Sequence, residues 1–244
     1  MKRLILIAVF SLGIYRSFAQ IDMEYWDKAG YAQIGSGMVF PGKEMKSTDA
    51  EGLFAKNGFQ LFTDFNFMIK YGFGLGLNVE YDEFLLNKPV YFHSSQADSM
   101  ETKGNYSTTK VGMNILLNLP VIVVKNKFAI NMYGEFTPGF RWFNIPEIDL
   151  YYNENVNKYV EVHYRTRQNF MGYLGYSGGL QFLFHDKWGI NMSYNSMIHT
   201  RHSVNYSVRM FDAFGNLYEG EEYLNNYLNN SGWKLGIIII FGKD

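Results

Sequence analysis

The chain has 244 residues with 22 basic and 23 acidic side chains, so its charge is nearly balanced and no basic excess indicates a nucleic-acid partner. It contains no cysteine, which excludes a disulfide framework, a thiolate metal site and a lipid anchor on an N-terminal cysteine. Aromatic residues make up 18% of the chain and proline occurs only 5 times, which is typical of an ordered, strand-rich protein.

Residues 1–20 differ from the rest of the chain. Two basic residues at the start precede an apolar run at residues 4–14, and a small residue, Ala19, follows. This order is typical of a secretory signal peptide, whereas the apolar run is too short for a comfortable helical membrane anchor. We therefore expect a cleaved signal peptide at 1–20, a polar lead-in at residues 21–30 and one domain at residues 31–244.

A first strand is predicted at residues 31–40, and the clearest strand signal follows at residues 57–85. Apolar or aromatic side chains alternate there with polar or small ones, at Phe59, Leu61, Phe65 and Phe67 and then, after a turn at residues 70–72, at Phe73, Leu75, Leu77, Val79 and Tyr81. A period of two over about ten residues is the pattern of a membrane-spanning β-strand. Because an open sheet edge in hydrocarbon leaves its backbone groups unpaired, such strands must close into a barrel.

The same alternation predicts the remaining strands, which bring the total to eight. They are residues 106–123, 128–140, 169–184, 188–200 and 231–241. The connections alternate between short turns, at 70–72, 120–127 and 185–187, and long loops, at 41–56, 87–105, 141–168 and 201–230. In an up-and-down meander every second connection lies at the same end, so one end carries short turns and the other carries long loops. Outer-membrane barrels show this asymmetry.

The two faces of the predicted strands differ in composition. The polar face is mostly Gly, Asn, Ser and Gln, which suits the narrow lumen of an eight-stranded barrel and leaves the large apolar side chains to face lipid. A soluble lipocalin-like barrel would instead place the apolar face inside, around a ligand. Five charged residues of the polar face are candidates for a structural network in the lumen: Asp64, Glu80, Lys110, Glu135 and Lys234. A gated polar path is the functional alternative for these residues.

Aromatic residues near the strand ends predict two interfacial girdles. The expected members are Trp188, Trp233, Tyr71 and Phe128 near the short turns, and Tyr81, Tyr106, Phe140 and Trp142 near the long loops.

With these features the chain resembles small eight-stranded outer-membrane β-barrels of the OmpA-transmembrane and OmpW-like class. The last strand, residues 233–241, alternates in polarity and ends in Phe241, and it is similar to the C-terminal signal read by the barrel-assembly machinery, although three residues follow the Phe here. The resemblance implies an all-β, antiparallel, up-and-down transmembrane barrel in the outer membrane of a Gram-negative bacterium. It also implies periplasmic short turns, extracellular long loops, surrounding outer-membrane lipid and assembly by that machinery.

The sequence holds no nucleophile elbow, phosphate loop or zinc signature, so we expect no catalytic residue, metal or cofactor. Some barrels of the resembled class are lipid-modifying enzymes that use His and Ser, and Ser196, His199 and His202 lie near the corresponding end, but no family motif surrounds them. The favoured hypothesis is a non-enzymatic barrel acting in envelope structure or in surface interaction through its Tyr-rich loops. The alternative is a porin-like narrow channel or a binder for a small apolar ligand, as the OmpW-like resemblance implies.

Overall fold

The structure is a computed structural model, and it describes residues 25–26, 29–48, 52–124, 127–153, 159–166, 169–198 and 201–242. The expected signal peptide at residues 1–20 lies outside these ranges. Among the described residues, no helix is long and apolar enough to cross a membrane.

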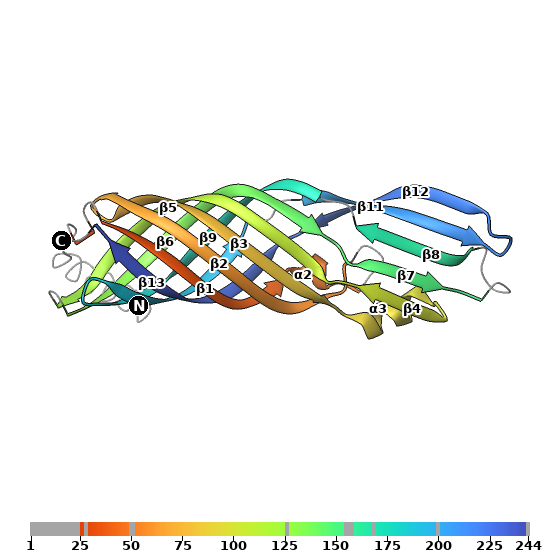
Figure 1. Cartoon of the computed structure of the whole chain (residues 1–244), viewed down its shortest axis with the longest axis horizontal. Helices are drawn as coiled ribbons and strands as arrows, with labels where there is room; N and C mark the ends of the chain where they lie inside the picture. Colours follow the sequence, from red (N-terminus) through yellow and green to blue (C-terminus); the bar gives the residue numbers. More distant parts are fainter. Residues whose placement is uncertain are drawn as a thin grey trace, which may run out of the picture.

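Eight strands form a closed antiparallel barrel (Figure 1). They are β1 (Gly30–Pro41), β2 (Ala55–Lys70), β3 (Phe73–Leu86), β5 (Tyr106–Val124), β6 (Phe128–Asn144), β9 (Asn169–Phe184), β10 (Trp188–Met197) and β13 (Asn230–Phe241). Each barrel strand pairs with the next one along the chain, and β1 closes the ring by pairing with β13. The predicted up-and-down barrel is therefore confirmed.

The short turns need backbone conformations that most residues avoid. Between β2 and β3, Tyr71 and Gly72 have φ angles of 54° and 78°. Two successive positive φ values suit the right-handed twist of a tight hairpin. His185 and Asp186 adopt the same region between β9 and β10, with φ angles of 53° and 52°.

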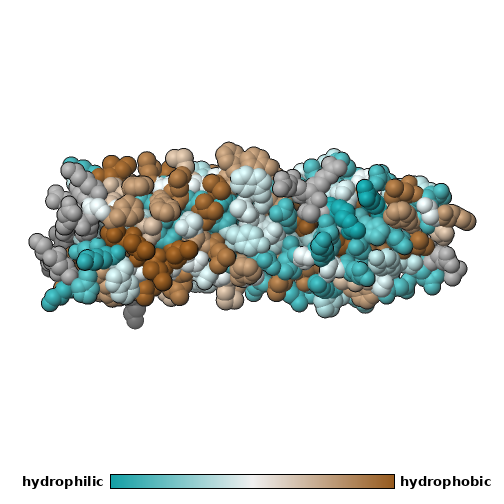
Figure 2. All heavy atoms as spheres, viewed as in Figure 1, coloured by the Kyte–Doolittle hydropathy of each residue, from teal (hydrophilic) through white to brown (hydrophobic). Residues whose placement is uncertain are grey.

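The barrel turns its apolar face outward and its polar face inward. Asp64 is 2% exposed whereas its neighbour Phe65 is 52% exposed. Leu75, Ile115 and Ile237 are exposed in the same way, while Asn78 and Asn114 are buried. Figure 2 shows the apolar side chains gathered over the barrel half of the molecule. An apolar surface of this extent suits lipid and not water, so the barrel is of the membrane-spanning kind and not lipocalin-like.

The long connections are not irregular loops, which corrects the sequence-based prediction. They contain β4 (Ser99–Lys103), β7 (Glu147–Tyr151), β8 (Tyr159–Thr166), β11 (Arg201–Asp212) and β12 (Leu217–Tyr227), paired in the order β12-β11-β8-β7-β4. The short helix α2 (Lys43–Lys46) lies in the connection between β1 and β2, and α3 (Lys88–Ser95) precedes β4 in the connection between β3 and β5. This second sheet extends beyond the barrel, at the end opposite the short turns (Figure 1).

The second sheet continues only part of the barrel wall. Its order follows that of the barrel strands β13, β10, β9, β6 and β5, to which its own strands are joined along the chain. Over β1, β2 and β3 the described residues do not continue the wall as strands; they form α2, α3 and the segment around Leu53 and Phe54.

The lead-in also differs from the expectation, because two of its residues close the short-turn end of the barrel. Trp26 is fully buried in an apolar cluster that includes Tyr31, Leu183 and Ile238. Its ring centroid lies 5.5 Å from that of Tyr31. The hydroxyl of Tyr25 donates a hydrogen bond of 2.6 Å to Asp186 in the turn between β9 and β10. These two residues therefore act as a plug and not as a polar linker.

Two girdle predictions are wrong. Trp233 pairs with Met38 and Tyr194 near the start of β13, and because β13 runs from the long-connection end to the short-turn end, Trp233 belongs to the long-connection side. Tyr106 is buried inside the molecule and is not on the lipid face. Trp188 and Tyr71, by contrast, are exposed at the short-turn end.

Candidate functional site: the polar lumen and the outer cavity

Three of the five predicted lumen residues meet in one buried ion-pair cluster. Glu80 on β3 stands directly opposite Lys110 on β5, and their side chains form an ion pair. Lys234 on β13 pairs with the other carboxylate oxygen of Glu80. Lys110 also lies 2.6 Å from Oδ2 of Asp82. Two acids and two bases thus neutralise each other out of contact with solvent, as buried charges must.

This cluster bridges the lumen. β13 and β3 are not neighbours, because β1 and β2 lie between them on the shorter way round the barrel, so the bond from Lys234 to Glu80 crosses the interior. Asn195 on β10 reaches the same carboxylate at 3.4 Å. The cavity beside these residues measures about 20 Å³, which is room for about one water molecule.

The other two predicted residues are placed differently. Asp64 accepts hydrogen bonds from the side-chain amides of Gln33, Asn78 and Asn114, the last two at 2.5 and 3.3 Å. Glu135 is half-buried and accepts hydrogen bonds from Thr137 at 3.2 Å and Ser177 at 3.4 Å. Side-chain amides therefore satisfy the carboxylate of Asp64, and hydroxyls satisfy that of Glu135.

Sequence reasoning missed Arg141, which is 1% exposed inside the outer end of the barrel. Its Nη1 donates a hydrogen bond of 2.6 Å to the carbonyl oxygen of Leu228. The prediction ended the strand at residue 140, whereas β6 continues to Asn144. The signal that could have found it is the alternation itself, since Thr137 and Arg141 share a face of β6.

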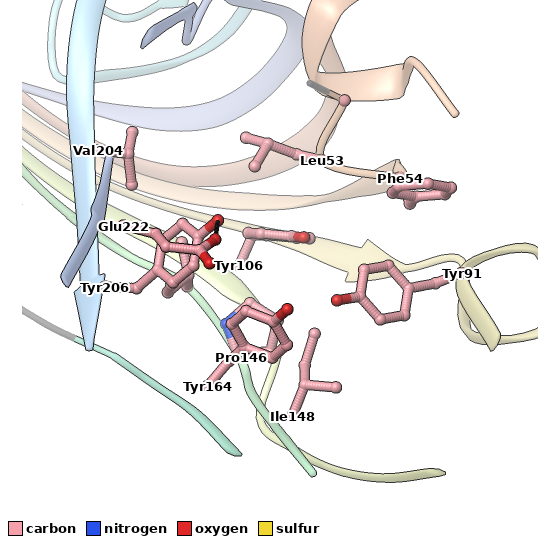
Figure 3. Close-up of a pocket in the computed structure, with 12 residues that line it drawn as sticks. Leu53, Phe54, Tyr91, Tyr106, Pro146, Ile148, Tyr164, Val204, Tyr206 and Glu222 are labelled. Atoms are coloured by element: carbon pink, nitrogen blue, oxygen red, sulfur yellow. Dashed lines mark hydrogen bonds between the residues drawn. The ribbon is translucent and has the colours of Figure 1, made fainter. Parts of the chain in front are cut away.

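A second site, which we call the outer cavity, lies where the mouth of the barrel meets the second sheet. It measures about 200 Å³ and is partly open to solvent. Its polar lining consists of Tyr91, Tyr106, Tyr164, Tyr206 and Glu222, and its apolar lining includes Leu53, Phe54, Ile148 and Val204. In Figure 3 the hydroxyl groups of Tyr91 and Tyr164 point into the space between these residues. Tyr206 donates a hydrogen bond of 2.9 Å to the carboxylate of Glu222.

The hydroxyls of the outer cavity remain protonated at neutral pH. Burial raises the pKa of Tyr164 to about 12. Burial also raises the pKa of Tyr91, and burial together with the hydrogen bond to Glu222 raises the pKa of Tyr206. Among the residues described as lining the cavity, Glu222 is therefore the charged one.

Among the described residues, no group of three or more His, Asp or Glu side chains is placed so that it could hold a metal ion. Ser196, His199 and His202 stand out in the sequence because some barrels of the resembled class use His and Ser at this end. His199 and the side chain of His202 lie outside the described residues.

No protein-family model matches the sequence, and no match is found among curated proteins. Solved structures that resemble the chain include the attachment invasion locus protein Ail of Yersinia pestis, with a TM-score of 0.48 and 11% identity over 88% of this chain and 99% of that one. Neisserial surface protein A follows with a TM-score of 0.43 and 10% identity, over 87% of this chain and 99% of that one. A major outer membrane protein from Thermus thermophilus has a TM-score of 0.43 and 9% identity, with the same coverage of 87% and 99%.

The strand order, the closure between β1 and β13 and the outward apolar face of this chain establish its architecture without these likenesses. The chain has the fold of a small eight-stranded outer-membrane β-barrel.

Proposed function

We propose that the chain is a non-enzymatic, integral protein of the outer membrane whose lumen is filled and which acts in envelope structure or surface interaction through its second sheet. In this proposal outer-membrane lipid surrounds the apolar belt, the barrel-assembly machinery reads β13, and the short turns face the periplasm. The second sheet then projects from the cell, where its exposed side chains can meet a surface partner.

The single observation that carries the proposal is the obstruction of the lumen at two levels. The bond from Lys234 to Glu80 spans the interior, and Trp26 fills the short-turn end. A narrow barrel whose interior is occupied by side chains is a stable membrane anchor and a poor channel.

The second sheet carries an exposed apolar side chain on an ordered turn, which suits binding to a surface partner. At the tip of the hairpin formed by β11 and β12, Phe214 is 91% exposed. The backbone N–H groups of Phe214 and Asn216 each donate a hydrogen bond of 2.9 Å to Asp212 Oδ1, so the turn is held in one shape. A large apolar side chain on an ordered turn suits an anchor for a partner, because little conformational entropy is lost on binding.

Two measurements test this proposal. Protein refolded into planar bilayers is expected to give no steady single-channel steps, and such steps would contradict the filled lumen. An epitope inserted at Gly215, in the hairpin tip, is expected to bind antibody on intact cells. The matched insertion at Asp186, in a short turn, should bind antibody only after the cells are permeabilised; the opposite labelling would contradict the orientation.

A second candidate function, a binder or narrow path for a small apolar ligand, is favoured by a groove of about 600 Å³ on the barrel wall. The pairing of β5 and β6 is interrupted between Gly112 and Ile115, opposite Pro138, which has no N–H to donate. The ring of Tyr173 closes the groove from inside, close to Gly112 and Gly139. Steady single-channel steps from the refolded protein would favour this candidate over the first.

A further inference from the structure

The outer cavity is built from parts of the chain that lie far apart in sequence. Tyr91 comes from α3, Tyr164 from β8, Tyr206 from β11 and Glu222 from β12. Its volume of about 200 Å³ suits a small organic ligand and not a chain. The cavity is partly open to solvent, so a solute can reach it.

The aromatic rings stand at angles to one another and form a cage. The ring centroids of Tyr164 and Tyr206 lie 5.5 Å apart with an interplanar angle of 58°. Tyr91 meets Phe54 edge to face, with centroids 5.1 Å apart and an angle of 81°. In Figure 3 the hydroxyl groups of Tyr91 and Tyr164 point into this small volume, so it is lined by hydroxyl oxygens that can accept hydrogen bonds.

The charge of the cavity lining favours a positively charged ligand. No Lys, Arg or His is among the described residues that line the cavity, whereas Glu222 contributes a carboxylate. The tyrosine hydroxyls stay neutral, because burial raises the pKa of Tyr91, Tyr164 and Tyr206. Hydroxyl oxygens and a carboxylate both accept hydrogen bonds from a cationic ammonium group, and apolar walls such as Ile148 exclude water from the apolar part of the ligand.

We infer that the outer cavity binds a small organic ammonium ion, with its charged group among the rings of Tyr91, Tyr164 and Tyr206 and beside the carboxylate of Glu222. The ammonium group belongs either to a free amine or to a lipid headgroup at the outer face of the membrane. This site is independent of the proposed surface role and of whether the lumen conducts.

Calorimetric titration of the refolded protein in an uncharged maltoside detergent tests the inference, with benzylammonium as the probe and benzyl alcohol as its uncharged counterpart. Benzylammonium is expected to bind saturably and about tenfold more tightly than benzyl alcohol, because only the cation forms charge-assisted hydrogen bonds to the hydroxyl oxygens and the carboxylate. Equal affinity for the two probes would overturn the inference.

Matched variants assign the effect to this cavity. Glu222→Gln is expected to weaken benzylammonium binding about fivefold, whereas Glu221→Gln, on the opposite face of β12, should leave it unchanged. Tyr164→Phe, which removes only the hydroxyl that points into the cavity, should also weaken benzylammonium binding, by about threefold, because that oxygen accepts a hydrogen bond from the ammonium group. Unchanged circular dichroism shows that each variant is folded.

Glu222→Gln separates a cation from an uncharged sugar, which gains nothing from the carboxylate's charge. Saturable binding of methyl glucoside together with unchanged benzylammonium affinity in Glu222→Gln would overturn the inference in favour of a carbohydrate. Nanodiscs distinguish the two sources of an ammonium group. Weaker benzylammonium binding in phosphatidylcholine discs than in the uncharged detergent would identify the lipid headgroup as the ligand, and equal binding would identify a free amine.

Discussion

The barrel and the second sheet use the same alternation of side chains in opposite senses. In the barrel, Phe65 faces outward and Asp64 inward. In the second sheet, Leu150 and Val208 are buried on the inner face, while Arg209 and Glu219 form an ion pair of 2.8 Å on the exposed outer face. A period of two therefore indicates a two-faced strand, and the surrounding solvent decides which face is apolar.

The inward-facing side chains change from polar to apolar within single strands, over about two residues. Along β3 the inward side chains pass from Asp82 to Phe84, and along β6 they pass from Arg141 to Phe143, all of them buried. The interior thus changes from polar to apolar near the outer ends of β3 and β6.

The largest expected effect comes from the buried ion pairs, which among the described residues lie only in the barrel. Glu80→Gln leaves Lys110 and Lys234 buried without their shared carboxylate, so we expect a loss of about 3–5 kcal/mol in the free energy of unfolding. Urea titration of the protein refolded into vesicles measures it.

The matched control is Glu219→Gln in the second sheet. Its carboxylate pairs with Arg209, but both side chains are more than half exposed, so its loss should cost less than about 1 kcal/mol. Equal losses for the two variants would show that the interior of the barrel is well solvated, contrary to the comparison drawn above.

The next largest loss of stability is expected from a charge on the apolar outer face of the barrel. Ile237→Arg places a charge on the apolar belt, and the expected cost is about 2–4 kcal/mol if the position lies near the bilayer midplane. Phe214→Arg, on the hairpin tip, also replaces an exposed apolar side chain, but it faces water and should change stability by less than about 0.5 kcal/mol. Vesicle unfolding compares the two, and a neutral Ile237→Arg would argue against lipid around β13.

The barrel strands could be predicted from the sequence because their apolar side chains stay on the same face over the whole membrane-spanning length. The sequence was not sufficient for the second sheet, where Val204 and Val208 alternate with polar residues inside a segment that reads as a loop. The pairing of Lys234 with Glu80 depends on the width of the closed barrel, which no local pattern encodes. The outer cavity depends on tertiary contact between segments more than a hundred residues apart.

The smallest effect is a pH response confined to the second sheet. Burial raises the pKa of Asp149, but hydrogen bonds from Arg165 and His163 outweigh it, so the net pKa is lowered. A lowered carboxyl pKa contributes stability above about pH 4 that is lost as the pH falls further. Amide exchange in β7 and β8 should therefore speed up between pH 5 and pH 3, after correction for the intrinsic rate.

Asp149→Asn should remove most of this response. Glu101→Gln, at the position opposite Asp149 on β4, should keep the wild-type response. A response in Asp149→Asn as large as that of the wild type would assign the effect to another acid, such as Glu161, which lies 3.3 Å from His163.

The most direct measurement uses the four tryptophans of the chain as reporters of the two environments. Variants that keep a single tryptophan, either Trp233 or Trp26, are refolded into vesicles of brominated phospholipid, in which bromine on the acyl chains quenches nearby fluorescence. Trp233 is exposed on the barrel wall and should be strongly quenched, whereas Trp26 is enclosed in the barrel and should not. Quenching of Trp26 with an unquenched Trp233 would mean that the wall does not face lipid, and the account would fail.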